Sequence, residues 1–353
     1  MDGADHLNDD RPSGSRRRRV VVLLAVVVVV AGLGIARVAQ LDPGRSSEVN
    51  RSSSVAPPPP TLIRPAEVAV PRGTLVVAAA GKINTVDLGS GAARSTAVPF
   101  DPERGSMAAV DDGAVVAPGG AAKARLLVAG GSALVPTPRA LTSNNRLVAG
   151  TDSSVWASRV DGPAARSTWR LADLEGHVEA TVRATAPVIS DGSGGLFEVG
   201  RRTFRQLYPA PSGPRLKGTV LGVGRDGYMV RPCADPDCAD PLDLYTRATN
   251  TYAKLPFTLP AAATGGVLSS NNRFVALTEQ DGEEHRLEVR SMTDGSVLRS
   301  FPQTTADEAV WLDQRWLALV SSDQLVLYDA VGNSSRTPRL DLDDIGALAW
   351  IPT

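Results

Sequence analysis

Two cysteines are the residues best suited to covalent chemistry. Cys233 and Cys238 are the only thiols among 353 residues and enclose the short segment Cys233-Ala234-Asp235-Pro236-Asp237-Cys238. In an exported protein, a close pair of this kind predicts a disulfide that closes a small loop. Two cysteines without a neighbouring histidine cannot supply the four ligands of a structural zinc site. We therefore expect a Cys233–Cys238 disulfide, with no metal and no cofactor.

Acidic residues around this pair offer a second interpretation, a calcium site with oxygen ligands. The aspartates concerned are Asp235, Asp237, Asp240 and Asp243. Their spacing lacks the glycine turn and the final glutamate of a calcium loop, and prolines already account for a turn here. A second cluster, Asp341, Asp343 and Asp344, alternates with apolar residues and fits an outer strand with a solvated face. Calcium is the weaker interpretation at both places.

Few residues have the pattern of a catalytic site. His177 and His285 each lie near glutamates, and we expect both to be surface residues of strands. The chain has no Gly-x-Ser-x-Gly nucleophile motif and no glycine-rich phosphate loop between a strand and a helix. A carboxylate pair that hydrolyses glycosides leaves no linear signature, so an enzyme remains the alternative. No catalytic residue is assigned from the sequence.

The charge balance argues against a nucleic-acid partner. Lys and Arg number 37 and Asp and Glu number 38, which gives a formal net charge of −1. A chain with interspersed acids and bases offers no broad positive face to phosphates. DNA and RNA are therefore excluded as main partners.

The N-terminal segment combines a basic block with an apolar run. Arg16 to Arg19 are four consecutive arginines, and Val20 to Ala36 form a stretch of 17 residues without a charge. This length is close to the ~20 apolar residues that span a membrane, and the basic block is expected to stay in the cytoplasm. We predict a cytoplasmic tail at 1–19 and a transmembrane signal-anchor helix at 20–37. A cleavable signal peptide with its cleavage site near Gly34 and Ala36 is the alternative.

A spacer follows this segment. Residues 38–67 contain Ser52-Ser53-Ser54 and the proline run from Pro57 to Pro60. Serine favours coil and consecutive prolines form an extended rod, so we expect a disordered linker. The remaining chain, 68–353, would then lie outside the cytoplasm at the plasma membrane, tethered by a single span.

Repeated segments indicate how 68–353 folds. Ser143-Asn144-Asn145-Arg146-Leu147-Val148-Ala149 returns as Ser270-Asn271-Asn272-Arg273-Phe274-Val275-Ala276, and in weaker form as Asp313-Gln314-Arg315-Trp316-Leu317-Ala318. The steps between copies fit a repeat of roughly 40 to 50 residues, which is typical of a four-stranded propeller blade. Tips between the first two strands of each unit are expected at 71–73, 111–113, 144–146, 191–194, 225–227, 271–273 and 313–315. These tips predict an all-β, seven-bladed propeller.

A second repeated element supports this interpretation. Acidic or polar turns at 85–91, 171–176, 289–295 and 327–332 are expected to join the third strand of a blade to the fourth. The C-terminal segment Gly346-Ala347-Leu348-Ala349-Trp350-Ile351-Pro352 is a strand without a sequence neighbour, and the first unit lacks an inner strand. We expect this C-terminal strand to complete the first blade and close the ring.

The segment Val310-Trp311-Leu312-Asp313-Gln314-Arg315-Trp316-Leu317-Ala318 resembles bacterial WD40-like and TolB-like β-propellers. The resemblance is at the level of fold, because the histidine and Trp-Asp pairs of true WD40 units are absent. It implies a platform for a protein or small ligand at one face of the ring. The five tryptophans, at 156, 169, 311, 316 and 350, are expected mainly to pack between blades.

These observations favour a membrane-anchored, extracytoplasmic and non-enzymatic binding platform for a protein or cell-envelope ligand. The alternative is an exported hydrolase or lyase that acts on a polysaccharide or peptide at the central channel. A structural or sensing ectodomain within a larger membrane complex is a third interpretation.

Overall fold

The computed structural model describes residues 69–119, 122–129, 131, 133–142, 146–159, 167–200, 203–209, 216–232, 241–338 and 344–353. The chain divides into two units, Met1–Pro65 and Ala66–Thr353, and every described residue belongs to the second unit. The predicted tail, transmembrane helix and most of the linker lie outside the described residues. Within the described ranges, no helix is long and apolar enough to cross a membrane.

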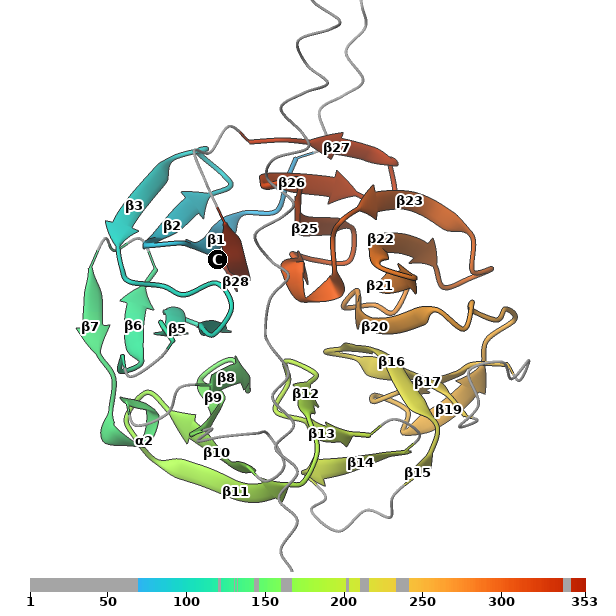
Figure 1. The fold of residues 1–353 in the computed structure, drawn as a ribbon, viewed down its shortest axis with the longest axis horizontal. Coiled ribbons are helices and arrows are strands. Elements are labelled where there is room, and N and C mark those ends of the chain that lie inside the picture. The colour runs from blue at the N-terminus through green and yellow to red at the C-terminus, as the bar shows by residue number, and fades with distance from the viewer. Residues whose placement is uncertain are drawn as a thin grey trace, which may run out of the picture. The chain divides into compact units, whose positions relative to one another are not determined.

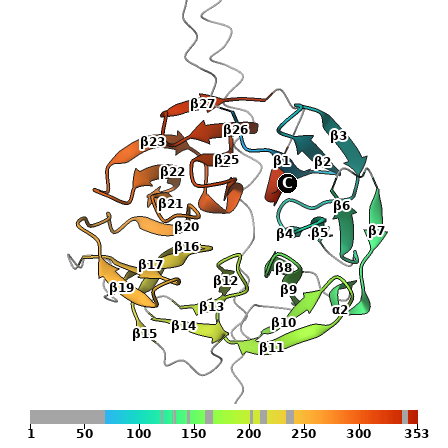
Figure 2. The same ribbon diagram turned by 180° about the vertical axis from the view of Figure 1, so that it is seen from behind.

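Antiparallel sheets arranged around a central axis make up the second unit (Figures 1 and 2). Each sheet runs outward from an inner strand, and successive sheets follow one another around the ring in chain order. Helical structure is limited to α2 (Arg139–Thr142) and the 3₁₀ turn η1 (Ala306–Glu308) within the described part. The predicted all-β propeller is confirmed.

Five sheets are separate four-stranded blades. In order from the axis outward, their strands are: β28 (Ile345–Pro352), β1 (Gly73–Ala79), β2 (Lys82–Asp87), β3 (Ala93–Ala97); β4 (Ser106–Val110), β5 (Gly113–Ala117), β6 (Arg125–Val128), β7 (Leu134–Pro136); β8 (Arg146–Ala149), β9 (Ser154–Ser158), β10 (Ser167–Asp173), β11 (Val178–Ala184); β12 (Val188–Ser190), β13 (Leu196–Val199), β14 (Thr203–Tyr208), β15 (Leu216–Lys217); and β24 (Ala309–Trp311), β25 (Trp316–Ser321), β26 (Gln324–Asp329), β27 (Ser334–Arg336).

The other eight strands form one continuous sheet, so the predicted count of seven blades is wrong: five four-stranded blades are present. The order in this sheet is β19 (Thr251–Lys254), β18 (Asp243–Thr246), β17 (Gly227–Arg231), β16 (Thr219–Gly224), β20 (Ala263–Leu268), β21 (Phe274–Asp281), β22 (Glu284–Ser291), β23 (Val297–Pro302). Two antiparallel meanders are joined because β16 and β20 pair in parallel at Val223 and Val267.

Glycines explain why β16 and β20 come close enough to pair. A Cβ on Gly224 would lie 2.8 Å from the Leu268 carbonyl oxygen, and one on Gly266 would lie 2.8 Å from the Leu221 carbonyl oxygen. Real Cβ atoms do not approach backbone this closely, so side chains at these positions would push the two strands apart. A repeat count taken from tips cannot detect such a junction, because the tips are the same whether neighbouring inner strands pair or stay separate.

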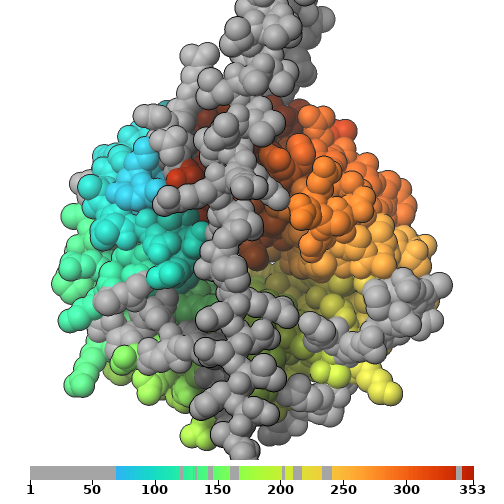
Figure 3. Space-filling model, viewed as in Figure 1, coloured from blue at the N-terminus to red at the C-terminus, as the bar shows by residue number. Residues whose placement is uncertain are grey.

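The C-terminal strand closes the ring, as expected. β28 pairs with β1 from Gly73 opposite Pro352 to Ala79 opposite Ile345. Figure 3 shows the dark red of the C-terminal strand next to the blue of β1. The first and last segments of the unit therefore share a blade, which leaves neither of these two strands as an unpaired inner edge.

The turns confirm most of the predicted positions. The turns after β2, β10, β22 and β26 join third and fourth strands, as expected for the four acidic or polar segments. The tip at 144–146 is wrong. Arg146 begins the inner strand β8, and the turn from β8 to β9 lies at Gly150–Ser153, whereas Arg273 ends the tip before the second strand β21. The similarity between these two segments is thus not a structural repeat.

Apolar side chains pack between neighbouring sheets. One cluster combines Leu75 and Trp350 of the closing blade with Trp316 and Leu327 of the β24–β27 blade. Other clusters fill the spaces between further pairs of sheets. Apolar surface is therefore buried between the sheets, and residues at the tips and along the axis do not have to form a hydrophobic core.

Candidate functional site at the axial channel

Inner strands line a continuous space along the axis. A cavity of about 940 Å³ and one of about 580 Å³ share lining residues from β4, β8, β12, β16, β20 and β28, so they are two parts of one channel. Most of the lining is Gly, Ala, Val, Leu, Ile, Ser and Thr. Small residues are expected where strands converge on an axis, because large side chains would collide.

The tip-face mouth is the end of the channel formed by turns between inner and second strands. It is lined by Asp111, Thr151, Asp152, Asp191, Gly192, Arg225, Ser270, Trp311, Asp313, Gln314 and Trp350. Asp111, Asp152, Arg225 and Gln314 are exposed. Charged and polar side chains from separate sheets therefore surround one opening.

Ion pairs connect the tips of different sheets. Arg225 donates to Asp152, joining the eight-stranded sheet to the β8–β11 blade, and Arg247 donates to Asp191, joining it to the β12–β15 blade. The Ser193 hydroxyl donates to the Arg225 carbonyl at 3.2 Å. The Asp152–Arg225 pair is about half exposed, so it contributes little to stability, but it fixes the position of Arg225 at the mouth.

Asp191 holds one of these tips from inside. Its side chain has no exposed surface, and Oδ1 accepts the backbone N–H groups of Ser193 at 2.8 Å and Gly195 at 2.9 Å. A Cβ on Gly195 would lie 2.0 Å from Asp191 Oδ2, so only glycine fits there. The Asp191 carboxylate thus accepts hydrogen bonds from the backbone of the turn and from the guanidinium of Arg247 at the same time.

A second bracing pair lies within one blade. Arg315 donates from Nε and Nη2 to the two carboxylate oxygens of Asp329, each at 2.5 Å. Burial alone would raise the pKa of Asp329, but the Arg315 hydrogen bonds and the Val331 and Gly332 N–H groups outweigh it and lower that pKa. The tip after β24 is thereby attached to the turn after β26.

Tryptophans mostly form core, as expected. Trp156, Trp169 and Trp316 are at most 2% exposed. Trp311 is partly exposed at the tip-face mouth, and its Nε1 donates to the Val267 carbonyl at 3.0 Å. Trp311 thus contributes aromatic surface to the mouth, a role that its spacing in the sequence did not reveal.

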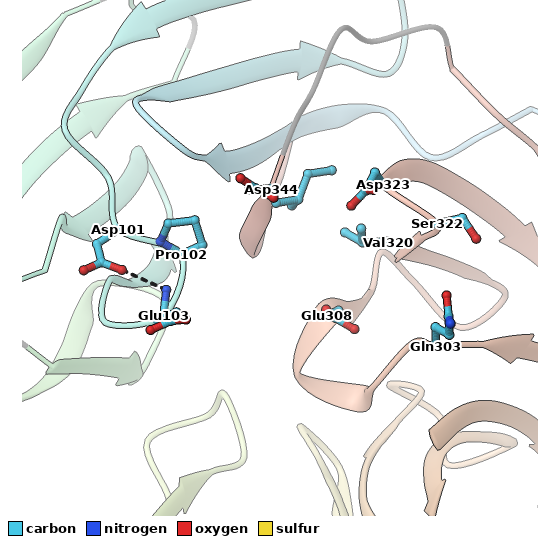
Figure 4. Close-up of a pocket in the computed structure, with 10 residues that line it drawn as sticks. Asp101, Pro102, Glu103, Gln303, Glu308, Val320, Ser322, Asp323 and Asp344 are labelled. Carbon is cyan, nitrogen blue, oxygen red and sulfur yellow. Dashed lines mark hydrogen bonds between the residues drawn. The ribbon is translucent and has the colours of Figure 1, made fainter. Parts of the chain in front are cut away.

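The opposite face has an acidic pocket of about 570 Å³. Figure 4 shows carboxylates from four separate segments around this space: Asp101 and Glu103, Glu308, Asp323, and Asp344. Some of these acids have local partners, since Asp101 accepts the Glu103 N–H at 3.0 Å and Glu308 accepts the Thr305 N–H at 2.8 Å. The sequence placed Asp344 on an outer strand, but it immediately precedes the inner strand β28.

The histidines lie on the surface, as predicted. His285 is exposed in β22, and His177 is exposed in the turn after β10. Asp173 Oδ2 lies 2.9 Å from His177 Nδ1, and this hydrogen bond raises the pKa of His177. Ligand atoms of Asp173, Glu175 and His177 lie within 4.8 Å of one another, an arrangement that the turn itself explains.

The channel contains no carboxylate pair among its described lining residues below the tip-face mouth. Asp307 is the one acid among the described residues that line the larger cavity, whereas glycoside hydrolysis uses a pair of carboxylates.

The two cysteines of the predicted disulfide, Cys233 and Cys238, lie outside the described residues, as do Asp235, Asp237, Asp240, Asp341 and Asp343. Asp243 is described, and its carboxylate pairs with Lys254 at 2.8 Å. This ion pair accounts for Asp243 without a calcium ion.

Comparison with known proteins supports the fold alone. No protein-family model and no curated protein matches the sequence. A functionally unknown protein from Desulfotomaculum acetoxidans matches 79% of this chain and 99% of its own at 10% identity, with a TM-score of 0.52. TolB from Acinetobacter baumannii matches 80% of this chain and 67% of its own at 11% identity, with a TM-score of 0.46. The β-propeller domain of Myceliophteria thermophila Cps50 (Swd1) matches 70% of this chain and 89% of its own at 11% identity, with a TM-score of 0.45. The resemblance to TolB-like and WD40-like β-propellers is confirmed as a resemblance of fold.

Proposed function

We propose that this β-propeller is a non-enzymatic platform that binds a protein or cell-envelope ligand at its tip-face mouth. One observation carries the proposal: exposed tip residues of separate sheets surround one opening and are held in place by ion pairs between the sheets. A surface fixed before binding loses less conformational entropy when a partner docks.

The chemistry of the mouth suits a polar partner with an aromatic or apolar anchor. Asp111, Asp152 and Arg225 present both signs of charge, and Trp311 adds a partly exposed ring. Binding hot spots are commonly tryptophan or arginine with a polar rim.

The localisation is also a proposal. The apolar stretch after Arg16 to Arg19 supports a membrane anchor with the propeller on the extracytoplasmic side. A C-terminal alkaline phosphatase fusion should be active, and a matched fusion lacking residues 1–37 should be inactive. Equal activity of the two fusions would contradict an exported location.

Binding at the tip face can be tested by charge reversal. Asp111 and Asp112 are exposed tip residues whose side chains make no hydrogen bond or ion pair with the described residues. In pull-downs from envelope extract, the full chain should capture a saturable partner that the double variant Asp111→Arg/Asp112→Arg loses.

The matched control reverses two acids on the other face. Glu283 and Glu284 are exposed at the turn between β21 and β22. Glu283→Arg/Glu284→Arg should keep the partner. Equal loss in both variants, or turnover of an envelope polymer without a partner, would contradict the proposal.

The hydrolase alternative retains one supporting observation, the acidic pocket of the opposite face. If it is correct, Glu308→Gln should abolish turnover of a polysaccharide or peptide while the tip-face variant remains active.

A further inference from the structure

Arg231 is the last residue of β17, and its side chain carries a buried positive charge. Its residue surface is 5% exposed. Its guanidinium makes no ion pair with the described residues, and Nη2 donates to the Pro260 carbonyl at 2.7 Å. Burial lowers the pKa of Arg231, but arginine remains protonated in proteins. A buried charge of this kind normally costs free energy unless it is paired.

Arg231 is an exception within the described part of this molecule. Each other buried charged residue has a partner of opposite sign: Asp191 with Arg247, Glu198 with Arg205, Glu279 with Arg286, Glu288 with Arg290, and Asp329 with Arg315. The other buried charges of the described part are therefore compensated by ion pairs, whereas the described partner of the Arg231 guanidinium is a neutral carbonyl.

Arg231 lies at the wall of the channel. It lines the larger cavity and pairs with Thr219 at the start of β16, the end of that strand remote from the tip-face mouth. The Pro260 carbonyl also accepts the Ala263 N–H at 3.0 Å. Arg231 thus lies near the first residues of β16 and β20, at the end of these strands that is remote from the Val223–Val267 pairing.

A β-bulge opens the backbone at the same place. The register between β20 and β21 shifts between Ala263 and Gly266, so Thr264 and Gly265 have no partners in that ladder. Both residues line the cavity, and a Cβ added to Gly265 would meet no atom within 4 Å. Bulges often occur beside functional sites, where they interrupt pairing and redirect groups.

The wall around Arg231 is largely apolar. Val188, Ile189, Val199 and Val223 line the same cavity and are partly exposed. The other charged lining residues are Arg146 and Asp307, both exposed. β16 has six residues, so at a rise of ~3.3 Å per residue the wall extends about 20 Å along the channel. This length accommodates a hydrocarbon body beside a single charged head.

We propose that the channel end at Arg231 binds a small amphiphilic carboxylate. The carboxylate accepts hydrogen bonds from the guanidinium, whose planar fork matches its two oxygens, and the apolar body lies along the channel wall. Exclusion of water strengthens this contact relative to the same pair at a surface. The site lies away from the tip-face mouth, so it does not depend on the proposed platform.

The first test uses ligands that differ in one group. Calorimetric titration of the full chain with hexanoate, 1-hexanol, hexylamine and acetate should show binding of hexanoate and weaker or no binding of the other three. Equal binding of hexanoate and 1-hexanol would show that the charge is unused and would overturn the proposal. Equal binding of acetate and hexanoate would overturn the role of the apolar wall.

The second test uses variants. Arg231→Gln should weaken hexanoate about 10- to 100-fold, the range expected for a hydrogen bond to a charged group. Arg146→Gln removes an exposed arginine of the same cavity and should leave the affinity unchanged. An unchanged affinity in Arg231→Gln would overturn the proposal; if this variant does not fold, the ligand series with the unaltered chain decides.

Discussion

Replacing Asp191 by alanine should show how strongly the tips are fixed by buried charge. The substitution removes an acceptor from the N–H groups of Ser193 and Gly195 and leaves Arg247 without its carboxylate. Each buried donor left unsatisfied costs about 1–3 kcal/mol. Arg247 is 33% exposed and can be partly rehydrated, so its contribution is discounted. We expect a total loss of about 3–5 kcal/mol in the free energy of unfolding, as measured for broken buried pairs.

Urea denaturation of the full chain, followed by tryptophan fluorescence, measures this loss. With a slope near ~3 kcal/mol/M, the midpoint of Asp191→Ala should fall by about 1 M or more. Asp226→Ala is the matched control, because Asp226 is exposed in the next tip and its side chain forms no hydrogen bond or ion pair within the described part of the chain. Asp191→Asn retains a carbonyl oxygen that can accept the N–H groups of the turn, so its urea midpoint should lie between those of Asp191→Ala and Asp226→Ala. Equal midpoints for Asp191→Ala and Asp226→Ala would refute the reasoning.

Three further predictions concern the junction, the closure and pH. Gly266→Ala should destabilise the unit by about 1–3 kcal/mol in urea, because its Cβ meets backbone, while Gly265→Ala next to it should have little effect. Trp350→Ala should cost about 3–5 kcal/mol in the same assay, since this ring packs in the core of the closing blade. The Arg315 contact lowers the pKa of Asp329 in the folded state. The ionised Asp329 carboxylate therefore adds to the free energy of unfolding above pH ~4, and this stabilisation is lost as the pH falls through the lowered pKa. Asp329→Asn should therefore lower the urea midpoint at pH 7 and make it less dependent on pH below 4; an unchanged acid slope would contradict this.

Local features of the fold could be predicted from the sequence because they depend on local chemistry. Turns after third strands place Asp87, Asp173, Asp294 and Asp329 where a carboxylate accepts nearby N–H groups, and this requirement is visible in the residues themselves. The closing strand could be predicted because an apolar strand at one end of the chain and a missing inner strand at the other are complementary. These inferences do not require knowledge of distant contacts.

The rest depends on long-range geometry. Arg146 follows two asparagines in the same way as Arg273, yet the first begins an inner strand and the second precedes a second strand. The pairing of Val223 with Val267 results from how closely two sheets approach, and no spacing encodes it. Arg231 looks like any arginine at a strand end, and only coordinates reveal that it is buried and that no acid of the described ranges pairs with it.

The two ends of the channel use charge in opposite ways, and this difference separates the two proposals experimentally. At the tip-face mouth, cations such as Arg225 and Arg247 are already paired, so the mouth presents a fixed pattern to a partner. At the far end, Arg231 forms no ion pair with the described residues, and in our proposal its charge binds a ligand. Under conditions where Asp191→Ala is still folded, the loosened tips should weaken partner capture while hexanoate affinity remains unchanged. Arg231→Gln should weaken hexanoate binding and leave partner capture unchanged. Loss of both partner capture and hexanoate binding in either variant would show that the two ends form a single site.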